Sequence, residues 1–166
     1  MINALTIVDN LGIIVDVQGM LENSLTLREA LAQHLNRAGL TQETYGSWIP
    51  IKIGPFALRL PNPKFRQRTL ILHDLHHVLT GYDTSFVGEG QVAAWEAKTG
   101  LAPHPMIWVF VLSAFAMGCS IAPAAMRQAW QRGRGGRNLF AAGFRPEMLD
   151  LTVGEMRRRC GLINTP

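Results

Sequence analysis

Three of the five histidines of the chain, His73, His76 and His77, lie within five residues, at the end of a segment whose apolar residues repeat with helical spacing. At about 100° per residue, the apolar side chains of residues 71–79 gather on one side of a helix. His73, Asp74, His76 and His77 fall on the opposite side. The segment therefore predicts a helix, central to the fold, whose polar face looks into a cleft or into water.

The spacing of His73 and His77 suits metal binding, because side chains four residues apart on a helix are about 5–6 Å from each other. Asp74 could add an oxygen ligand. Gly81 is a plausible end for the helix, and a next helix opening near Glu89 could return that carboxylate as a fourth ligand. A mixed nitrogen and oxygen set predicts zinc first, with iron and manganese as alternatives. The competing interpretation is the wet side of an ordinary amphipathic helix.

The order His73-Asp74, two residues, His77, eleven residues, Glu89 resembles the HDxxHx11E signature of the Coq-four family of ubiquinone (coenzyme Q) biosynthesis proteins. The resemblance covers residues 64–96. It implies a single helical domain over residues 1–166 with His73, Asp74, His77 and Glu89 as metal ligands. It also implies a metal-dependent oxidative decarboxylation of a prenylated aromatic acid, with a prenylated quinone precursor or another isoprenoid lipid, and a quinone-biosynthesis protein complex, as partners. His76 would support the ligands or face solvent.

Two other functions stay open. An HD-type phosphohydrolase also uses an adjacent His-Asp pair, and it would recruit His34 and Asp150 as further ligands while leaving His77 and Glu89 without roles. A lipid-binding or scaffold protein with a structural metal would need no catalytic residue at all. We identify no catalytic side chain from the sequence, although an enzyme is the favoured interpretation.

The remaining segments predict a mainly α single domain with a small β-hairpin, or two extended segments, near residues 48–60. Thr26 and Glu29 form a capping box for a helix that runs to Gly39. Asn62 is a candidate cap, with Pro63 at the first position of the central helix. A second capping box, at residues 152–155, predicts a short basic helix at the end of the chain.

The stretch from Thr99 to Met126 contains no Lys, Arg, Asp or Glu. Its length would suffice to span a bilayer, but Gly118 and Pro123 divide it. We therefore expect a buried core helix over residues 105–117, with a lipid-facing groove as the alternative.

Arg66 precedes His73 by seven residues and falls on the same helix face. It could hold a substrate carboxylate, or it could be a surface arginine.

The net charge of +4 is concentrated at the end of the chain, where residues 127–166 hold eight arginines and three acidic residues. Such a basic end could contact an anionic membrane surface. The first basic residue is Arg28, so no signal peptide is predicted, and the two cysteines lack disulfide spacing. We expect a cytoplasmic protein, with peripheral contact to the inner membrane as an option, and no nucleic-acid partner.

Overall fold

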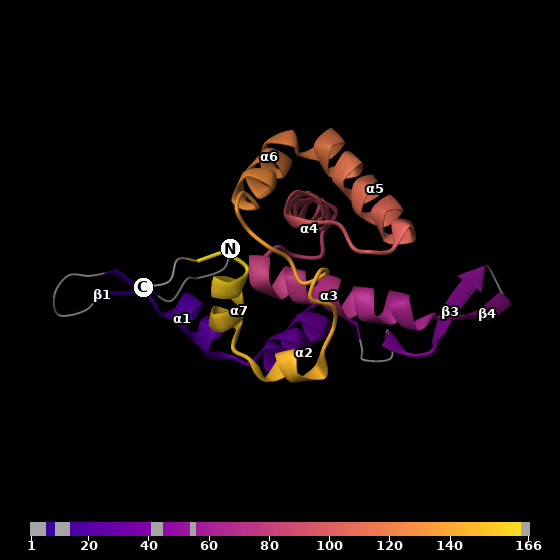
Figure 1. Cartoon of the computed structure of the whole chain (residues 1–166), viewed down its shortest axis with the longest axis horizontal. Coiled ribbons are helices and arrows are strands. Elements are labelled where there is room, and N and C mark those ends of the chain that lie inside the picture. Colours follow the sequence, from indigo (N-terminus) through magenta and orange to yellow (C-terminus); the bar gives the residue numbers. More distant parts are fainter. Residues whose placement is uncertain (1–5, 9–13, 41–44, 54–55, 164–166) are drawn as a thin grey trace.

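The protein is mainly α-helical, as the sequence predicts, and one long helix crosses its middle (Figure 1). The computed structural model describes residues 6–8, 14–40, 45–53 and 56–163. Helix α3 (Lys64–Thr80) crosses the middle of the molecule, with α4, α5 and α6 on one side and α2 and α7 on the other (Figure 1). The other helices are α1 (Val17–Ser24), α2 (Leu27–Arg37), α4 (Phe86–Thr99), α5 (Pro105–Ile121), α6 (Pro123–Arg132), the 3₁₀ helix η2 (Pro146–Asp150) and α7 (Val153–Arg159).

Two small antiparallel hairpins flank the helices (Figure 1). Strands β3 (Trp48–Ile53) and β4 (Phe56–Pro61) pair from Trp48 opposite Pro61 to Ile53 opposite Phe56, which confirms the hairpin expected near residues 48–60. Its predicted turn at residues 54–55 lies outside the described residues. Strands β1 (Thr6–Val8) and β2 (Ile14–Asp16) form the second hairpin, in a segment whose structure the sequence left open.

Most helix ends follow local sequence signals. Thr26 and Glu29 form the complete capping box of α2, and Gly81 ends α3 with a φ of 75°. The start of α3 differs from the expectation, because Pro63 is the N-cap and the Asn62 side chain is used elsewhere. Its amide donates to the Gly46 carbonyl and its oxygen accepts from Arg66 Nη1. Helix ends are therefore predictable where the capping side chain bonds to its own helix, as Thr26 does, and not where it bonds to another segment, as Asn62 does.

Helix α5 is longer and more exposed than the sequence predicts. It continues through Gly118 to Ile121, and only Ile107, Val111 and Gly118 are buried, so the expectation of a buried core helix is wrong. Gly118 lies inside the helix, where it packs against Gly90 of α4 and Met126 of α6 and where a β-carbon would clash. In the described part of the chain, no helix is both long and apolar enough to cross a membrane.

The main core lies between the central helix and its neighbours. Leu75 and Leu79 of α3, Leu27 of α2 and Trp95 of α4 are fully buried. Since α3 contacts neighbours on several sides, its polar residues also become buried, which matters for the site below.

Candidate metal centre

Two histidines of α3 and one glutamate of α4 converge on a single point. The Nε2 atoms of His73 and His77 are 3.3 Å apart. The carboxylate oxygens of Glu89 lie 3.2 Å from His73 Nε2 and 3.4 Å from His77 Nε2. Three of the four ligands expected from the sequence are therefore brought together.

The connection between α3 and α4 places Glu89 at this point. Ser85 caps α4 by accepting a hydrogen bond from the Gly88 N–H, and Glu89 falls in the first helical turn. Gly88 packs directly against the backbone of Asp83, and a β-carbon there would overlap Asp83. A glycine is thus required where the helix start closes onto the preceding loop. Helix α4 begins at Phe86, earlier than the expected start near Gly88.

Both ligand histidines are held by their second ring nitrogen. His73 Nδ1 donates to Glu96 Oε1 at 2.9 Å, and His77 Nδ1 donates to the Tyr82 carbonyl at 3.0 Å. These bonds fix each ring so that its Nε2 atom faces the convergence point, an arrangement typical of metal-binding histidines.

The donor separations fit a small divalent cation. Bonds of about 2.0–2.1 Å in a tetrahedral site place neighbouring ligand atoms about 3.4 Å apart. His73 Nε2 lies 3.3 Å from His77 Nε2 and 3.2 Å from Glu89 Oε2, close to this value, while the other Glu89 oxygen, Oε1, lies 3.4 Å from His77 Nε2. Two imidazoles with one carboxylate form a set that both zinc and iron accept. The residues present therefore fit a metal, and an ion bound here would still have an open coordination position.

The charges of the site are coupled in the metal-free protein. Burial raises the pKa of Glu89, but hydrogen bonds with His73 and His77 outweigh burial and hold it below its usual value. Burial lowers the pKa of His73, yet Glu96 and Glu89 raise it well above its usual value overall. The carboxylates are thus ionised at neutral pH and available to a cation, which would displace a proton from His73 on binding.

Asp74 lies outside this cluster, contrary to the expectation that it is a fourth ligand. Its carboxylate is buried, accepts a hydrogen bond from Tyr45 Oη, and lies 3.9 Å from His34 Nε2. His34 stacks on His77 with ring centroids 5.2 Å apart, and its buried Nε2 has no hydrogen-bond partner among the residues that the structure describes. These residues support the back of His77, away from the convergence point.

Glu96 was not predicted from the sequence, and it supports the side of the site opposite to Asp74 and His34. It is fully buried, and its Oε1 accepts from both His73 Nδ1 and His76 Nδ1. Burial raises the pKa of Glu96, but His73 and His76 lower it overall to about 2. Glu96 follows Glu89 by seven residues, two helical turns, so the same face of α4 carries both carboxylates. That spacing was the available signal.

His76 is fully buried and does not face solvent, which was one of two roles expected for it. Its Nδ1 donates to Glu96 at 2.7 Å and its Nε2 accepts from the Leu139 N–H at 3.0 Å. Burial lowers its pKa, so it is a neutral supporting residue.

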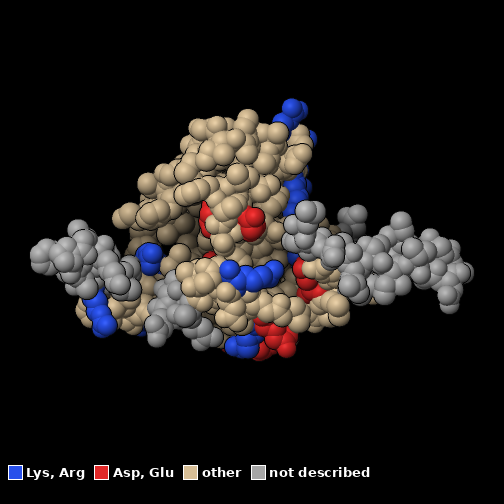
Figure 2. Space-filling view, turned by 180° about the vertical axis from the view of Figure 1, so that it is seen from behind, with Lys and Arg blue, Asp and Glu red and all other residues tan. Residues whose placement is uncertain are grey.

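An apolar cavity of about 360 Å³ opens beside the cluster. His73 and Glu89 line it and are partly exposed, whereas His77 is buried. Figure 2 shows a hollow next to the acidic residues in the middle of this face. Apolar residues of α5 and neighbouring segments form the other wall, namely Ile107, Phe110, Val111, Ala114, Met117 and Phe140.

Arg66 also lines this cavity, as its helical position predicted. Its Nη1 donates to Asn62 Oδ1 at 3.0 Å, which holds the side chain at the cavity rather than free in solvent. It remains a candidate for binding a substrate carboxylate.

Asp150, the further ligand required by an HD-type phosphohydrolase, forms an exposed ion pair with Arg28. Among the described residues the metal-ligand cluster does not include it. The geometry therefore favours the His73, His77 and Glu89 set over the HD-type arrangement.

Comparisons of the chain with protein-family models, curated proteins and solved structures give no match.

Proposed function

We propose that the chain is a metal-dependent enzyme of ubiquinone biosynthesis that oxidatively decarboxylates a prenylated aromatic acid. The observation that carries the proposal is the placement of three convergent ligand atoms at the wall of an apolar cavity. A purely structural metal site is closed by protein ligands, whereas a catalytic site keeps a position for substrate or water. His73 and Glu89 face such a space.

The lining of the cavity supports a substrate with one apolar end and one anionic end. Apolar side chains from α5 would contact an isoprenoid tail, and Arg66 would bind the ring carboxylate near His73 and Glu89. The resemblance of residues 73–89 to the Coq-four signature narrows this amphipathic class to a prenylated quinone precursor. A partner complex of other quinone-biosynthesis proteins belongs to the same proposal.

The residues of the chain have distinct roles in this proposal. His73, His77 and Glu89 would hold the ion, which would bind substrate oxygen and stabilise negative charge as the carboxylate leaves. Glu96 and the Tyr82 carbonyl would keep the imidazoles oriented. In the overall reaction the ring carboxylate would leave as carbon dioxide and a hydroxyl group derived from water would take its place, with dioxygen as the two-electron oxidant that is reduced to hydrogen peroxide. Zinc has no redox chemistry of its own, so iron or manganese would suit this step better.

The test is turnover by the purified full-length protein. Protein loaded separately with zinc, iron or manganese is incubated aerobically with a prenylated hydroxybenzoate, and carbon dioxide and the hydroxylated product are measured. We expect product with at least one metal and none from His77→Ala. If no metal supports turnover although the prenylated acid binds, the chain is a lipid-binding or scaffold protein whose metal is structural.

A further inference from the structure

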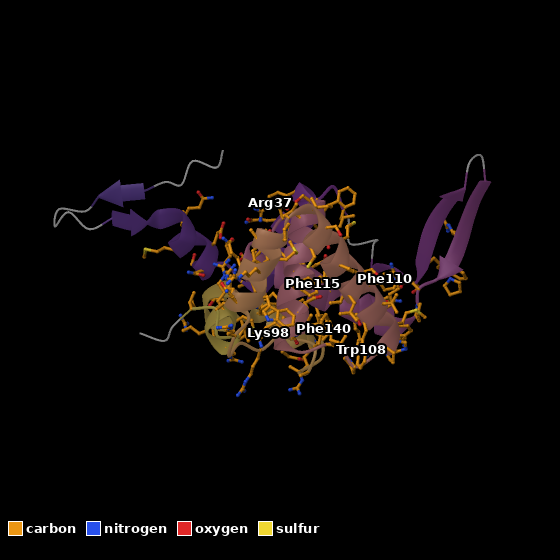
Figure 3. The ribbon with its side chains drawn as sticks, turned by 90° about the horizontal axis from the view of Figure 1, so that it is seen from above. Arg37, Lys98, Trp108, Phe110, Phe115 and Phe140 are labelled. Carbon is orange, nitrogen blue, oxygen red and sulfur yellow. The ribbon has the colours of Figure 1, made fainter. Side chains whose placement is uncertain are left out.

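The outward face of α5 is apolar along its whole length. Its exposed large side chains are Met106, Trp108, Val109, Phe110, Leu112, Met117 and Ile121. Contiguous exposed apolar surface of this kind marks an interaction site in a folded protein. We call these seven residues the α5 face; Figure 3 labels two of them, Trp108 and Phe110, on the side of the molecule nearer the β3–β4 hairpin.

The segment that holds the α5 face carries charge of one sign. Between Glu96 and Glu147 the chain has no Asp or Glu, but it has one lysine and five arginines. In Figure 2 the basic residues in this part of the molecule lie on the side of α6, and no acidic residue is seen over α5 or α6. The surroundings of the apolar face therefore attract anions.

Exposed cations lie near both ends of the α5 face. Arg127 is exposed in the second turn of α6, directly after the end of α5. At the other end, Phe65 stacks on His104 with ring centroids 4.0 Å apart, which brings the first turns of α3 to the start of α5. Those turns contain exposed Lys64 and Arg68.

We propose that the α5 face docks on the surface of an anionic lipid membrane. Its apolar side chains enter the boundary between head groups and acyl chains, and Lys64, Arg68 and Arg127 contact the anionic head groups. This inference rests on surface chemistry and does not depend on the metal centre. Phe110 and Met117 belong to both the α5 face and the cavity lining, so docking also places the cavity wall at the lipid surface.

Charge decides between a membrane and a second copy of the chain. A two-fold contact through the α5 face would oppose the same surface on both copies. Such a dimer would bring the positive charges of Lys64, Arg68 and Arg127 on the two copies into one interface. Residues 97–146, which include α5 and α6, contain no acidic residue that could pair with these cations. An anionic lipid surface instead offers a partner to each of these cations.

The first experiment is vesicle flotation of the full-length protein. Vesicles contain three parts phosphatidylcholine to one part phosphatidylglycerol, or phosphatidylcholine alone. We expect binding to the anionic vesicles that weakens with added salt. Val109→Gln with Leu112→Gln should weaken binding by roughly tenfold or more, because two exposed apolar groups are lost. Arg127→Gln should weaken it by about fivefold.

Matched controls come from the opposite part of the molecule. Met20 and Leu21 of α1 are as exposed as Val109, and Arg158 of α7 is exposed like Arg127. Met20→Gln with Leu21→Gln, and Arg158→Gln, should bind like the wild-type protein.

The wild-type chain provides a second measurement, because Cys119 is exposed on α5 whereas Cys160 is buried. A polarity-sensitive fluorophore on Cys119 should shift to the blue when anionic vesicles are added. No shift, no flotation, or equal weakening by the α1 control pair would overturn the proposal. A dimer in solution that only the α5 substitutions dissociate would overturn it as well, because a second copy would then cover this face.

Discussion

Replacing Glu96 by Gln tests whether this buried carboxylate prepares His73 for a metal. Glu96 Oε1 lies 2.9 Å from His73 Nδ1 and 2.7 Å from His76 Nδ1. Glutamine keeps the shape and one acceptor oxygen but removes the charge, which makes His73 Nε2 a weaker ligand and its ring less fixed. Loss of such a supporting group costs about 10–100-fold in metal affinity, which corresponds to about 1.4–2.7 kcal/mol.

The assay is a competition titration of zinc against a chelator of known affinity at pH 7. Glu155→Gln is the control, because Glu155 lies on the surface of α7, where it pairs with Arg159. The fold should survive, since Glu96 Oε2 already has no hydrogen-bond partner in the described part of the chain and an unpaired buried amide costs only about 1–3 kcal/mol. Zinc affinity in Glu96→Gln within twofold of the wild-type value, with the control also unchanged, would refute the role assigned to Glu96.

Three further outcomes follow from the site. His77→Ala should lower the metal content from about one ion per chain to a small fraction, because the substitution removes the most buried ligand. Metal analysis of protein purified without chelator measures this content. An unchanged content would exclude the site. Glu89→Gln should abolish turnover with little change in melting temperature, whereas an active variant that melts early would show a structural ion. The pKa of Glu96 is lowered from 4.5 to about 2 by folding, so its ionised form stabilises the protein above pH 4.5 and this contribution is lost as the pH falls from about 4.5 to about 2. Thermal melts of the metal-free protein across that range should show a shallower decline in Glu96→Gln than in the wild-type chain.

The sequence predicts the parts of this site that depend on local geometry. The four-residue spacing of His73 and His77 needs only one turn of helix to bring their rings together. The position of Glu89 also depends on the helix end at Gly81, which the sequence predicts, and on the start of α4, which lies at Phe86 rather than at the expected Gly88-Glu89. Glu96 interacts through tertiary packing of α4 on α3, so only its seven-residue offset from Glu89 was available as a signal.

Burial was the property that the sequence could not supply. The absence of charged residues in α5 led us to expect a buried helix. In the structure α5 packs against α4 and α6, and only Ile107, Val111 and Gly118 of this helix are buried. An apolar helix surface has the same sequence pattern whether it contacts protein or lipid, so the sequence alone does not distinguish the two. Conversely, the polar face of α3 was expected to meet a cleft or water, but His76, His77 and Asp74 are buried. Neighbouring helices on several sides of α3 account for that difference.

The placement of Asp74 leads to a last prediction. On a helix Asp74 is turned about 100° from His73, which carries its carboxylate toward α2 and away from Glu89. It accepts a hydrogen bond from Tyr45, whose pKa is raised by burial and by the Asp74 charge, so the phenol stays protonated and keeps donating. Asp74→Ala should therefore lower the free energy of unfolding by about 1–3 kcal/mol, because the Tyr45 hydroxyl loses its acceptor.

The metal content of this variant should remain near one ion per chain. Tyr45→Phe is the matched variant, since it removes the same hydrogen bond without touching the carboxylate. We expect both variants to bind metal like the wild-type protein, and the double variant to be less destabilised than the sum of the two, because the residues share one interaction. If Asp74→Ala loses more than half of its metal while Tyr45→Phe keeps it, and both retain their helical circular dichroism, Asp74 rotates to bind the ion and is a ligand after all.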